Sequence, residues 1–148
     1  MGIESVSEYD AAEILLLINE HFPYMHLGFE RLVKRIHHPQ FFFQKAMEKE
    51  NLVGYAEWQI LNPKEGIIQL NGIVVKPWHQ GKGYGKILME AGEKWARKKK
   101  LEKIRLLVAT SNENAKKLYR LSGFAFKKIH PKKIGGEKAE VWEKKLVL

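Results

Sequence analysis

The chain of 148 residues contains no cysteine. This excludes disulfide bonds, thiolate zinc sites and a cysteine nucleophile. The chain also lacks any run of eighteen apolar residues, and no basic segment followed by an apolar one stands at its start. These absences argue against a membrane-spanning helix and an export signal. We therefore expect a cytoplasmic protein that does not use a membrane as a partner.

Acidic residues are the scarcer charged class, with 17 Asp and Glu against 26 Lys and Arg, which gives a net charge of +9 at pH 7. Such an excess favours an anionic partner. Coenzyme A, nucleic acid and an acidic protein surface all qualify, and charge alone does not separate them.

Size and pattern predict one domain over residues 1–148. A hydrophobic content of 45% supports one substantial core, and the chain shows no repeat or low-complexity linker. Strands are predicted at 2–6, 41–46, 52–61, 67–75, 103–109, 124–129 and 138–146. Helical stripes are predicted over 11–18, 29–36, 86–100 and 112–122. Short loops make the early strands antiparallel, and the helix at 86–100 brings 103–109 back parallel to 67–75. We expect a mixed α/β sheet of six or seven strands with helices on both faces.

A glycine-rich turn between a strand and a helix is the most informative stretch. After Pro77 the chain reads Gln80-Gly81-Lys82-Gly83-Tyr84-Gly85, and the helical pattern begins at Lys86. The first amide hydrogens of a helix lack partners and the helix dipole adds positive charge there, so an anion is favoured. Glycines let the backbone approach that anion closely. The turn is therefore a candidate phosphate site, although three glycines also fit a plain flexible loop.

Two common phosphate-binding motifs do not fit this turn. The dinucleotide fingerprint needs Gly-x-Gly-x-x-Gly and a later acidic residue, whereas the spacing here is Gly-x-Gly-x-Gly. The nucleoside-triphosphate loop needs Ser or Thr after its lysine, and Ile87 follows Lys86. Both alternatives are excluded by their own residues.

The turn resembles the pyrophosphate loop Gln/Arg-x-x-Gly-x-Gly/Ala of the GNAT N-acetyltransferase superfamily, with Gln80, Gly83 and Gly85 at those positions. A second stretch, residues 112–124, is similar to the family's motif B, Asn-x-x-Ala-x-x-x-Tyr-x-x-x-Gly-Phe. The resemblance implies a three-layer, mostly antiparallel GNAT fold, splayed between strands 67–75 and 103–109. The pantetheine arm of acetyl-coenzyme A would enter that gap.

The resemblance also implies which residues bind the cofactor. The backbone of the strand end would pair with pantetheine, the turn would hold the pyrophosphate, and residues of motif B would complete the site. These residues are Ile73, Val74, Val75, Gln80, Gly81, Lys82, Gly83, Tyr84, Gly85, Lys86, Asn112, Lys116 and Tyr119. Asn112 would also cap its helix. For Lys116, an exposed helix lysine is the alternative.

Catalysis would depend on an acid and a base. Tyr119 matches the family's tyrosine, which implies a general acid for the leaving thiolate; a core tyrosine is the alternative. Some family members have a glutamate where Gln69 stands here. We therefore expect Glu57 to act as base through water, with a solvent-facing strand residue as the alternative. His26, His79 and His130 are further candidates, and none shows metal-ligand spacing.

Aromatic residues of the first loop and the third strand are candidates for the acceptor pocket: Phe22, Tyr24, His26, Tyr55 and Trp58. Ordinary core packing is their alternative explanation. Gly72 lies inside the central strand, so we expect a bulge at Asn71-Gly72 whose freed amides could bind an oxyanion.

The resemblance predicts an acyltransferase that moves an acetyl group from acetyl-coenzyme A to a primary amine of a small molecule or peptide. The amine would attack directly in a ternary complex. A non-catalytic coenzyme A-binding domain remains an alternative because of Gln69. A basic nucleic-acid binding module is disfavoured because no such motif is present. The oligomeric state is open, with a homodimer as one option.

Overall fold

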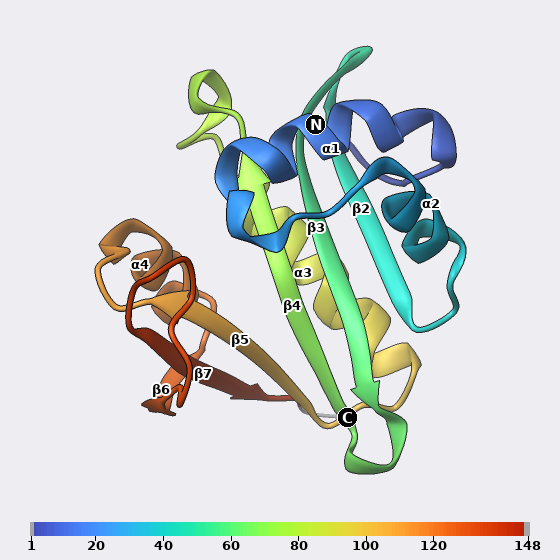
Figure 1. The fold of residues 1–148 in the computed structure, drawn as a ribbon. Coiled ribbons are helices and arrows are strands. Elements are labelled where there is room, and N and C mark those ends of the chain that lie inside the picture. Colours follow the sequence, from blue (N-terminus) through green and yellow to red (C-terminus); the bar gives the residue numbers. More distant parts are fainter. Residues whose placement is uncertain (1, 147–148) are drawn as a thin grey trace.

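The computed structural model describes residues 2–146, and its seven strands form one mixed sheet (Figure 1). The spatial order is β1-β2-β3-β4-β5-β7-β6. The strands are β1 (Gly2–Ser5), β2 (Phe41–Glu48), β3 (Asn51–Asn62), β4 (Ile67–Val75), β5 (Lys103–Ala109), β6 (Ala125–Ile129) and β7 (Ala139–Lys145). Among these described strands only β4 and β5 are parallel neighbours; the other adjacent pairs are antiparallel. The predicted fold class is confirmed.

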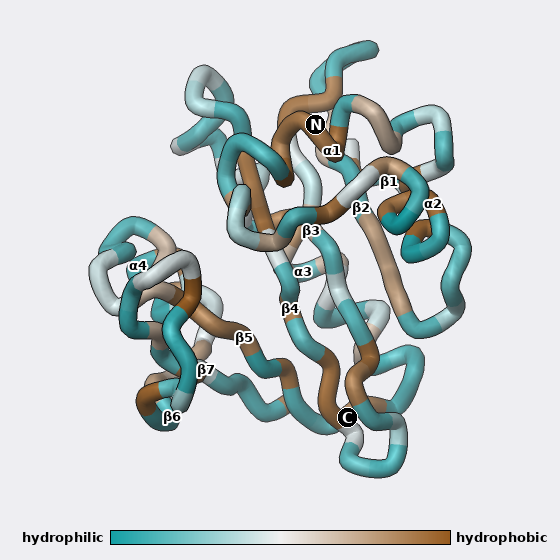
Figure 2. The backbone as a smooth tube through the Cα atoms, in the orientation of Figure 1, coloured by the Kyte–Doolittle hydropathy of each residue, from teal (hydrophilic) through white to brown (hydrophobic). Residues whose placement is uncertain are grey.

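Four α-helices cover the sheet: α1 (Ala11–His21), α2 (Phe29–His37), α3 (Tyr84–Lys98) and α4 (Glu113–Leu121). Helices α1 and α2 lie on one face and α3 on the other (Figure 1). Hydrophobic stretches follow the strands and α1, whereas the loops are largely hydrophilic (Figure 2). None of the helices within residues 2–146 combines the length and apolar character needed to cross a membrane.

Helix α3 starts and stops two residues earlier than its apolar pattern predicts. Gly83, at φ 93°, is its N-cap, so the helix already begins at Tyr84. At the other end Lys100 has φ 59°, and the Leu101 amide donates to the Ala96 carbonyl over 3.0 Å. This is the bonding of a left-handed C-terminal cap, which a lysine can adopt in place of glycine.

The sheet opens between β4 and β5. These strands pair only from Ile67 with Lys103 to Leu70 with Leu106, and beyond that point they diverge toward α4 (Figure 1). The carboxyl half of β4 therefore has a free backbone edge on this side, as the family resemblance implies.

A bulge interrupts β4 where the opening begins. Glu57 of β3 pairs with Gly72 and Trp58 pairs with Leu70, so Asn71 is an extra residue without a partner. A Cβ at position 72 would lie 2.9 Å from Cε2 of Phe22, which explains why glycine occupies this site. The predicted bulge at Asn71-Gly72 is confirmed.

The core is divided by the sheet into two apolar clusters. One lies between the sheet and α3, and the other lies under α1 and α2. Trp58 belongs to the first cluster; it is fully buried and its Nε1 donates to Oε1 of Gln44 at 2.9 Å. The ring lies directly against Gly92 of α3, where a Cβ would come within 1.9 Å of Cζ2.

We expect Gly92→Ala to destabilise the protein even though alanine is the better helix former. The new methyl would overlap the Trp58 ring, and overpacking a tight core costs typically about 1–3 kcal/mol. We expect a loss of about 3 kcal/mol, or a fall in Tm of about 10 °C, measured by thermal unfolding. Gly28→Ala is the matched control, because a Cβ at 28 meets no atom within 4 Å. A Gly92→Ala variant as stable as the control would contradict this packing.

Candidate active site

A groove of about 490 Å³ opens at the divergence of β4 and β5. Three segments that are far apart in the sequence meet there: the end of β4, the turn leading into α3, and one face of α4. The residues that line it are Ile73, Val75, His79, Gln80, Gly81, Gly83, Tyr84, Gly85, Lys86, Asn114, Ala115, Leu118 and Tyr119. The two sequence motifs therefore share one cavity.

The glycine turn presents bare main chain to this groove. Gly81 and Gly83 have φ angles of 79° and 93°, and around both a Cβ would meet open space. No side chain caps the start of α3, so the amides of its first turn point out without helical partners. Gly85 has a different role, because a Cβ there would touch Leu118 at 3.5 Å, which shows how closely α3 and α4 approach. This is a cradle that fits a diphosphate.

The polar side chains of the turn lie to the sides of the cradle and do not cover its main-chain amides. The Gln80 side chain turns back, and its Nε2 donates to the Val75 carbonyl at 3.0 Å. Lys82 is half-exposed, with its Nζ 3.8 Å from Glu48, and Lys86 is exposed, with its Nζ 4.0 Å from Glu90. Both lysines are weakly held and free to turn toward an anion.

Glu48 supports the turn and was missed by sequence reasoning. Its Oε2 lies 2.6 Å from Nδ1 of His79, and its Oε1 faces Lys82. It also acts on Tyr84, whose pKa is raised by burial and by this carboxylate. Glu48 ends β2, far from the turn in the sequence, so no local pattern could have indicated the contact.

The last three residues of β4 do not all point their side chains into the groove. Ile73 and Val75 line the groove, whereas the Val74 side chain is buried in the cluster under α1 and α2. Alternation along the strand therefore leaves only the main chain of Val74 for a ligand.

Helix α4 is anchored by its polar residues. The Asn112 side chain accepts from the Ala115 amide at 3.1 Å, which confirms the predicted N-cap. Lys116 is buried, and its Nζ lies 3.1 Å from Glu140 and 3.4 Å from Glu113. The alternative of an exposed helix lysine is wrong for Lys116, and its contact with a phosphate stays a prediction. The missed partner is Glu140 of β7, which ties α4 to the sheet.

The Glu140 carboxylate predicts an acid-sensitive step in stability. Burial acts to raise its pKa, but hydrogen bonds from Trp142, Lys116 and Thr110 outweigh burial and lower it below 4.5. A lowered pKa gives stability above the unfolded value, and that stability is lost as the pH falls. Between about pH 5 and pH 3 we expect the Tm of Glu140→Gln to fall less than the Tm of the wild type. Parallel curves for Glu140→Gln and the wild type would refute this, with the exposed Glu4→Gln as control.

Tyr119 lies deep in the groove, on α4. Its side chain is 7% exposed and its ring packs 6.0 Å from that of Phe124. Burial raises the pKa of the phenol to about 12, with a smaller contribution from Tyr24. The hydroxyl is therefore fully protonated at neutral pH, as a proton donor must be.

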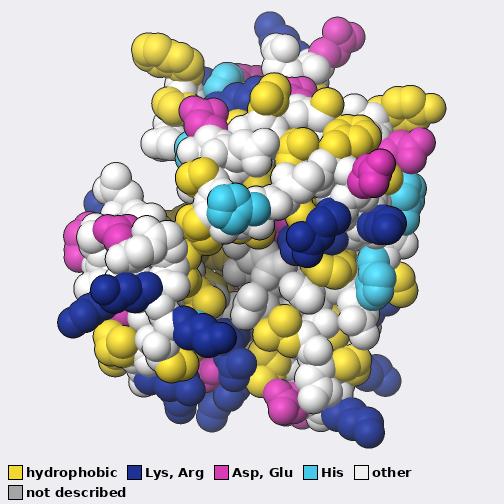
Figure 3. Space-filling view, in the orientation of Figure 1, with side chains coloured by type: hydrophobic (Ala, Val, Ile, Leu, Met, Phe, Trp, Pro, Cys, Tyr) yellow, Lys and Arg dark blue, Asp and Glu magenta, His cyan; other side chains and the backbone are white. Residues whose placement is uncertain are grey.

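A second, smaller cleft of about 190 Å³ opens on the α1–α2 side of the same divergence. It lies in the hollow between the lobe of α4, β6 and β7 and the rest of the molecule (Figure 3). Its lining residues are Tyr24, Met25, Gln69, Leu70, Asn71, Leu107 and Ile134. The two cavities lie on opposite sides of one gap, as a donor site and an acceptor site would.

The predicted acceptor residues are only partly brought together. Phe22 packs over Gly72. The Tyr24 ring lines the cleft and contacts the Phe22 ring edge-on, with 6.3 Å between the ring centroids. Tyr55 is buried beneath them, with its hydroxyl close to Gly72. His26 is exposed, with φ 47°, and lies outside the cleft lining. The placement of Trp58 in this pocket is wrong, because its side chain points to the other face, toward α3.

Glu57 is the centre of a buried hydrogen-bond network. Its Oε2 accepts from Arg35 Nη1 at 2.9 Å and from Asn71 Nδ2 at 2.8 Å. Asn71 also donates to Gln59 at 3.0 Å and accepts from Gln69 at 2.9 Å. Burial raises the pKa of Glu57, and Asn71 and Arg35 offset part of that rise. The alternative of a solvent-facing residue is wrong for Glu57, since it is 1% exposed.

The other two candidate histidines, His79 and His130, do not line the second cleft. His79 is held by Glu48, and the ring nitrogen of His130 lies 3.2 Å from the Lys132 amide. No group of three or more His, Cys, Asp or Glu within residues 2–146 is arranged to hold a metal ion.

Comparison with solved structures shows the same fold in several acetyltransferases. A spermidine N-acetyltransferase from Vibrio cholerae matches with a TM-score of 0.80 and 22% identity, covering 98% of this chain and 95% of that one. The PaiA N-acetyltransferase from Thermoplasma acidophilum, solved with coenzyme A, matches with a TM-score of 0.80 and 22% identity. The match covers 98% of this chain and 99% of that one. The ribosomal-protein-S18-alanine N-acetyltransferase from Escherichia coli matches with a TM-score of 0.79 and 20% identity. The match covers 99% of this chain and 94% of that one.

No match was found among curated protein sequences. The model of the acetyltransferase (GNAT) family matches residues 9–124, which include the glycine turn and motif B. Since that match spans most of the sequence, the chain belongs to the GNAT acetyltransferase family.

Proposed function

We propose that the chain is an N-acetyltransferase that uses acetyl-coenzyme A to acetylate a primary amine of a small molecule or peptide. The observation that carries this proposal is the groove that is lined both by the glycine turn, with its bare amides, and by the buried Tyr119. We infer further that the chain folds as one domain, since a single sheet joins all described strands.

The cofactor would be held by main chain at both ends of its reactive arm. The amides from Gly81 to Lys86 would bind the pyrophosphate, and Lys82 and Lys86 would add charge. The free edge of β4 would pair with the pantetheine arm like an added strand. Because Gln80 already occupies the Val75 carbonyl, this pairing would use the groups of Ile73 and Val74.

Acetyl transfer forms a carbon–nitrogen bond and breaks the carbon–sulfur bond of the thioester. The acceptor amine, entering from the second cleft, would attack the acetyl carbon as a free base. Tyr119 would give its proton to the leaving thiolate, and amides freed by the bulge at Asn71 would stabilise the oxyanion. The proton that the amine loses would pass through water, assisted by Glu57 and its hydrogen-bond network, and would restore the proton that Tyr119 gave to the sulfur.

The proposal is tested by titration calorimetry and by an assay of thiol release with a panel of amines. Acetyl-coenzyme A should bind and raise the Tm, while nicotinamide dinucleotides and nucleoside triphosphates should not. At least one primary amine should be acetylated. Binding without transfer to any amine would leave only a coenzyme A-binding domain, and absence of binding would overturn the proposal.

A further inference from the structure

The acceptor cleft carries little charge of its own. Its lining within residues 2–146 contains no Asp, Glu, Lys or Arg; the amides of Gln69 and Asn71 form the polar part. Tyr24 and the neighbouring apolar side chains form the walls. Such a cleft can take the neutral form of an amine, but it offers no unmatched carboxylate to a second cationic group of the acceptor.

The carboxylates near this cleft already have partners: Glu137, which bridges to Ile134, accepts from the Ser111 hydroxyl at 2.9 Å, and the two in the sheet are paired with cations. Glu57 is bonded to Arg35 at 2.9 Å and is almost fully buried. Glu143 of β7 lies 3.2 Å from Arg105 and 3.4 Å from Lys103, and its side chain is 13% exposed. Each of these two sheet carboxylates is therefore matched by cations of the chain itself, and at Glu143 two cations face one carboxylate, which leaves positive charge in excess.

Cations continue from the cleft along β5. Ile104, Leu106 and Val108 face α3, so alternation puts Lys103, Arg105 and Leu107 on the cleft side. Arg105 lies beside Gln69 in register and two residues from Leu107, which lines the cleft. At 3.3 Å per residue, its Cα is about 7 Å from that of Leu107.

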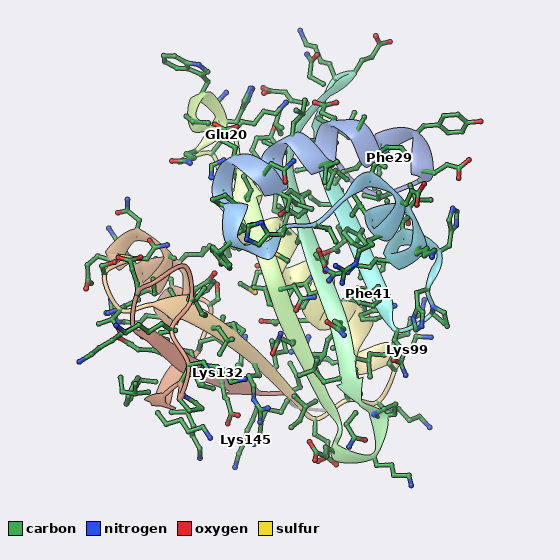
Figure 4. The ribbon with its side chains drawn as sticks, viewed as in Figure 1. Glu20, Phe29, Phe41, Lys99, Lys132 and Lys145 are labelled. Carbon is green, nitrogen blue, oxygen red and sulfur yellow. The ribbon has the colours of Figure 1, made fainter. Side chains whose placement is uncertain are left out.

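Positive charge is in excess on this surface. Lys145 pairs in register with Lys103, and the three cations Lys103, Arg105 and Lys145 outnumber the two carboxylates beside them, Glu143 and Glu102. Lys132, from the connection between β6 and β7, lies on the same lobe as Lys145 (Figure 4). Figure 3 shows Lys and Arg side chains gathered over this lobe, at the lower end of the hollow.

We propose that the preferred acceptor is an amine that carries a carboxylate about two extended residues away, such as the amino terminus of an acidic peptide. This rests on the proposed function. The amine would occupy the cleft between Asn71 and Leu107, and the carboxylate would reach Arg105 and Lys145. Polycationic amines would be poor acceptors, because the same surface repels them.

The test compares peptides that differ in one side chain. Three hexapeptides, Ala-Ala-Xaa-Ala-Ala-Ala with a free amino terminus and an amidated carboxyl terminus, carry Glu, Gln or Lys as Xaa; spermidine is the fourth acceptor. We expect kcat/KM to be about tenfold higher for the Glu peptide than for the Lys peptide at low salt. The difference should shrink at high ionic strength.

Variants of the full chain locate the effect. Arg105→Gln and, separately, Lys145→Gln should each lower kcat/KM for the Glu peptide about three- to tenfold and leave the Gln peptide unchanged. Lys145→Gln is included because Lys145 is exposed at a strand end, so this variant should fold normally even if Arg105→Gln does not. Lys94→Gln removes the same charge from the exposed side of α3, on the other face of the sheet, and should leave the ratio unchanged.

The outcomes separate the two proposals. Equal or faster acetylation of the Lys peptide or spermidine would overturn the acceptor class while leaving the N-acetyltransferase intact. An unchanged Glu-to-Gln ratio in both Arg105→Gln and Lys145→Gln would do the same. Failure to acetylate any of the four amines, while another amine of the wider panel is acetylated, would also overturn the acceptor class alone. Failure to bind acetyl-coenzyme A, or to acetylate any amine of that panel, would overturn the acceptor class together with the activity on which it rests.

Discussion

Replacing Tyr119 with phenylalanine is expected to lower kcat about 100-fold, because general acid catalysis contributes typically 10²–10⁴-fold. Phenylalanine keeps the ring, which packs on Phe124, and removes only the proton donor. The Kd for acetyl-coenzyme A should therefore stay near the wild-type value. Steady-state assays of thiol release and titration calorimetry measure the two quantities separately.

Tyr9→Phe is the matched control, since Tyr9 is 92% exposed and far from the groove, and its kcat should equal that of the wild type. The pH profile gives a second check. With a pKa of about 12, the Tyr119 phenol stays protonated up to strongly alkaline pH, so its ionisation should not limit the rate at pH 7–9. A Tyr119→Phe enzyme with unchanged kcat would remove this residue from the mechanism.

Gly83→Val is expected to weaken acetyl-coenzyme A binding about 10- to 100-fold. Gly83 has φ 93°, a conformation that costs a β-branched residue of order 1–3 kcal/mol, and each 1.4 kcal/mol is a factor of ten in Kd. The variant turn would relax to another conformation, so the binding conformation would have to be restored at that cost. Titration calorimetry measures the Kd directly.

Gly28→Val is the control for this substitution. Gly28 has φ −93° and ψ 167°, an extended conformation that valine accepts, and a Cβ there meets no atom within 4 Å. Its Kd should match the wild type. Wild-type affinity in Gly83→Val would mean that the left-handed turn is not needed to hold the phosphates.

Local patterns predicted most of the fold for identifiable reasons. The capping asparagine at 112 and the glycine at 123 mark the two ends of α4 through backbone chemistry that acts over a few residues. The bulge could be predicted from Gly72, because glycine inside a buried strand indicates close approach of another group. Here that group is Phe22. The divergence of β4 and β5 was expected only from the resemblance to the GNAT family, because no local pattern in either strand indicates it.

The errors arose where a side chain depends on distant partners. Alternation along β3 puts Tyr55 and Trp58 on opposite faces, so both could not line one pocket; the sequence contained this signal. Which of them faces α3 was decided by Gly92, which leaves room for the indole ring. The burial of Lys116 depends on Glu140, and the support of His79 depends on Glu48. Neither partner is near in sequence.

The central claim is that main-chain amides between Gly81 and Lys86 hold a diphosphate and thereby place the thioester in the gap beside β4. A crystal structure of the chain with acetyl-coenzyme A tests it most directly. We predict phosphate oxygens about 3 Å from those amides and the thioester sulfur within hydrogen-bond reach of the Tyr119 hydroxyl. A cofactor bound elsewhere, with the glycine turn vacant, would contradict the claim.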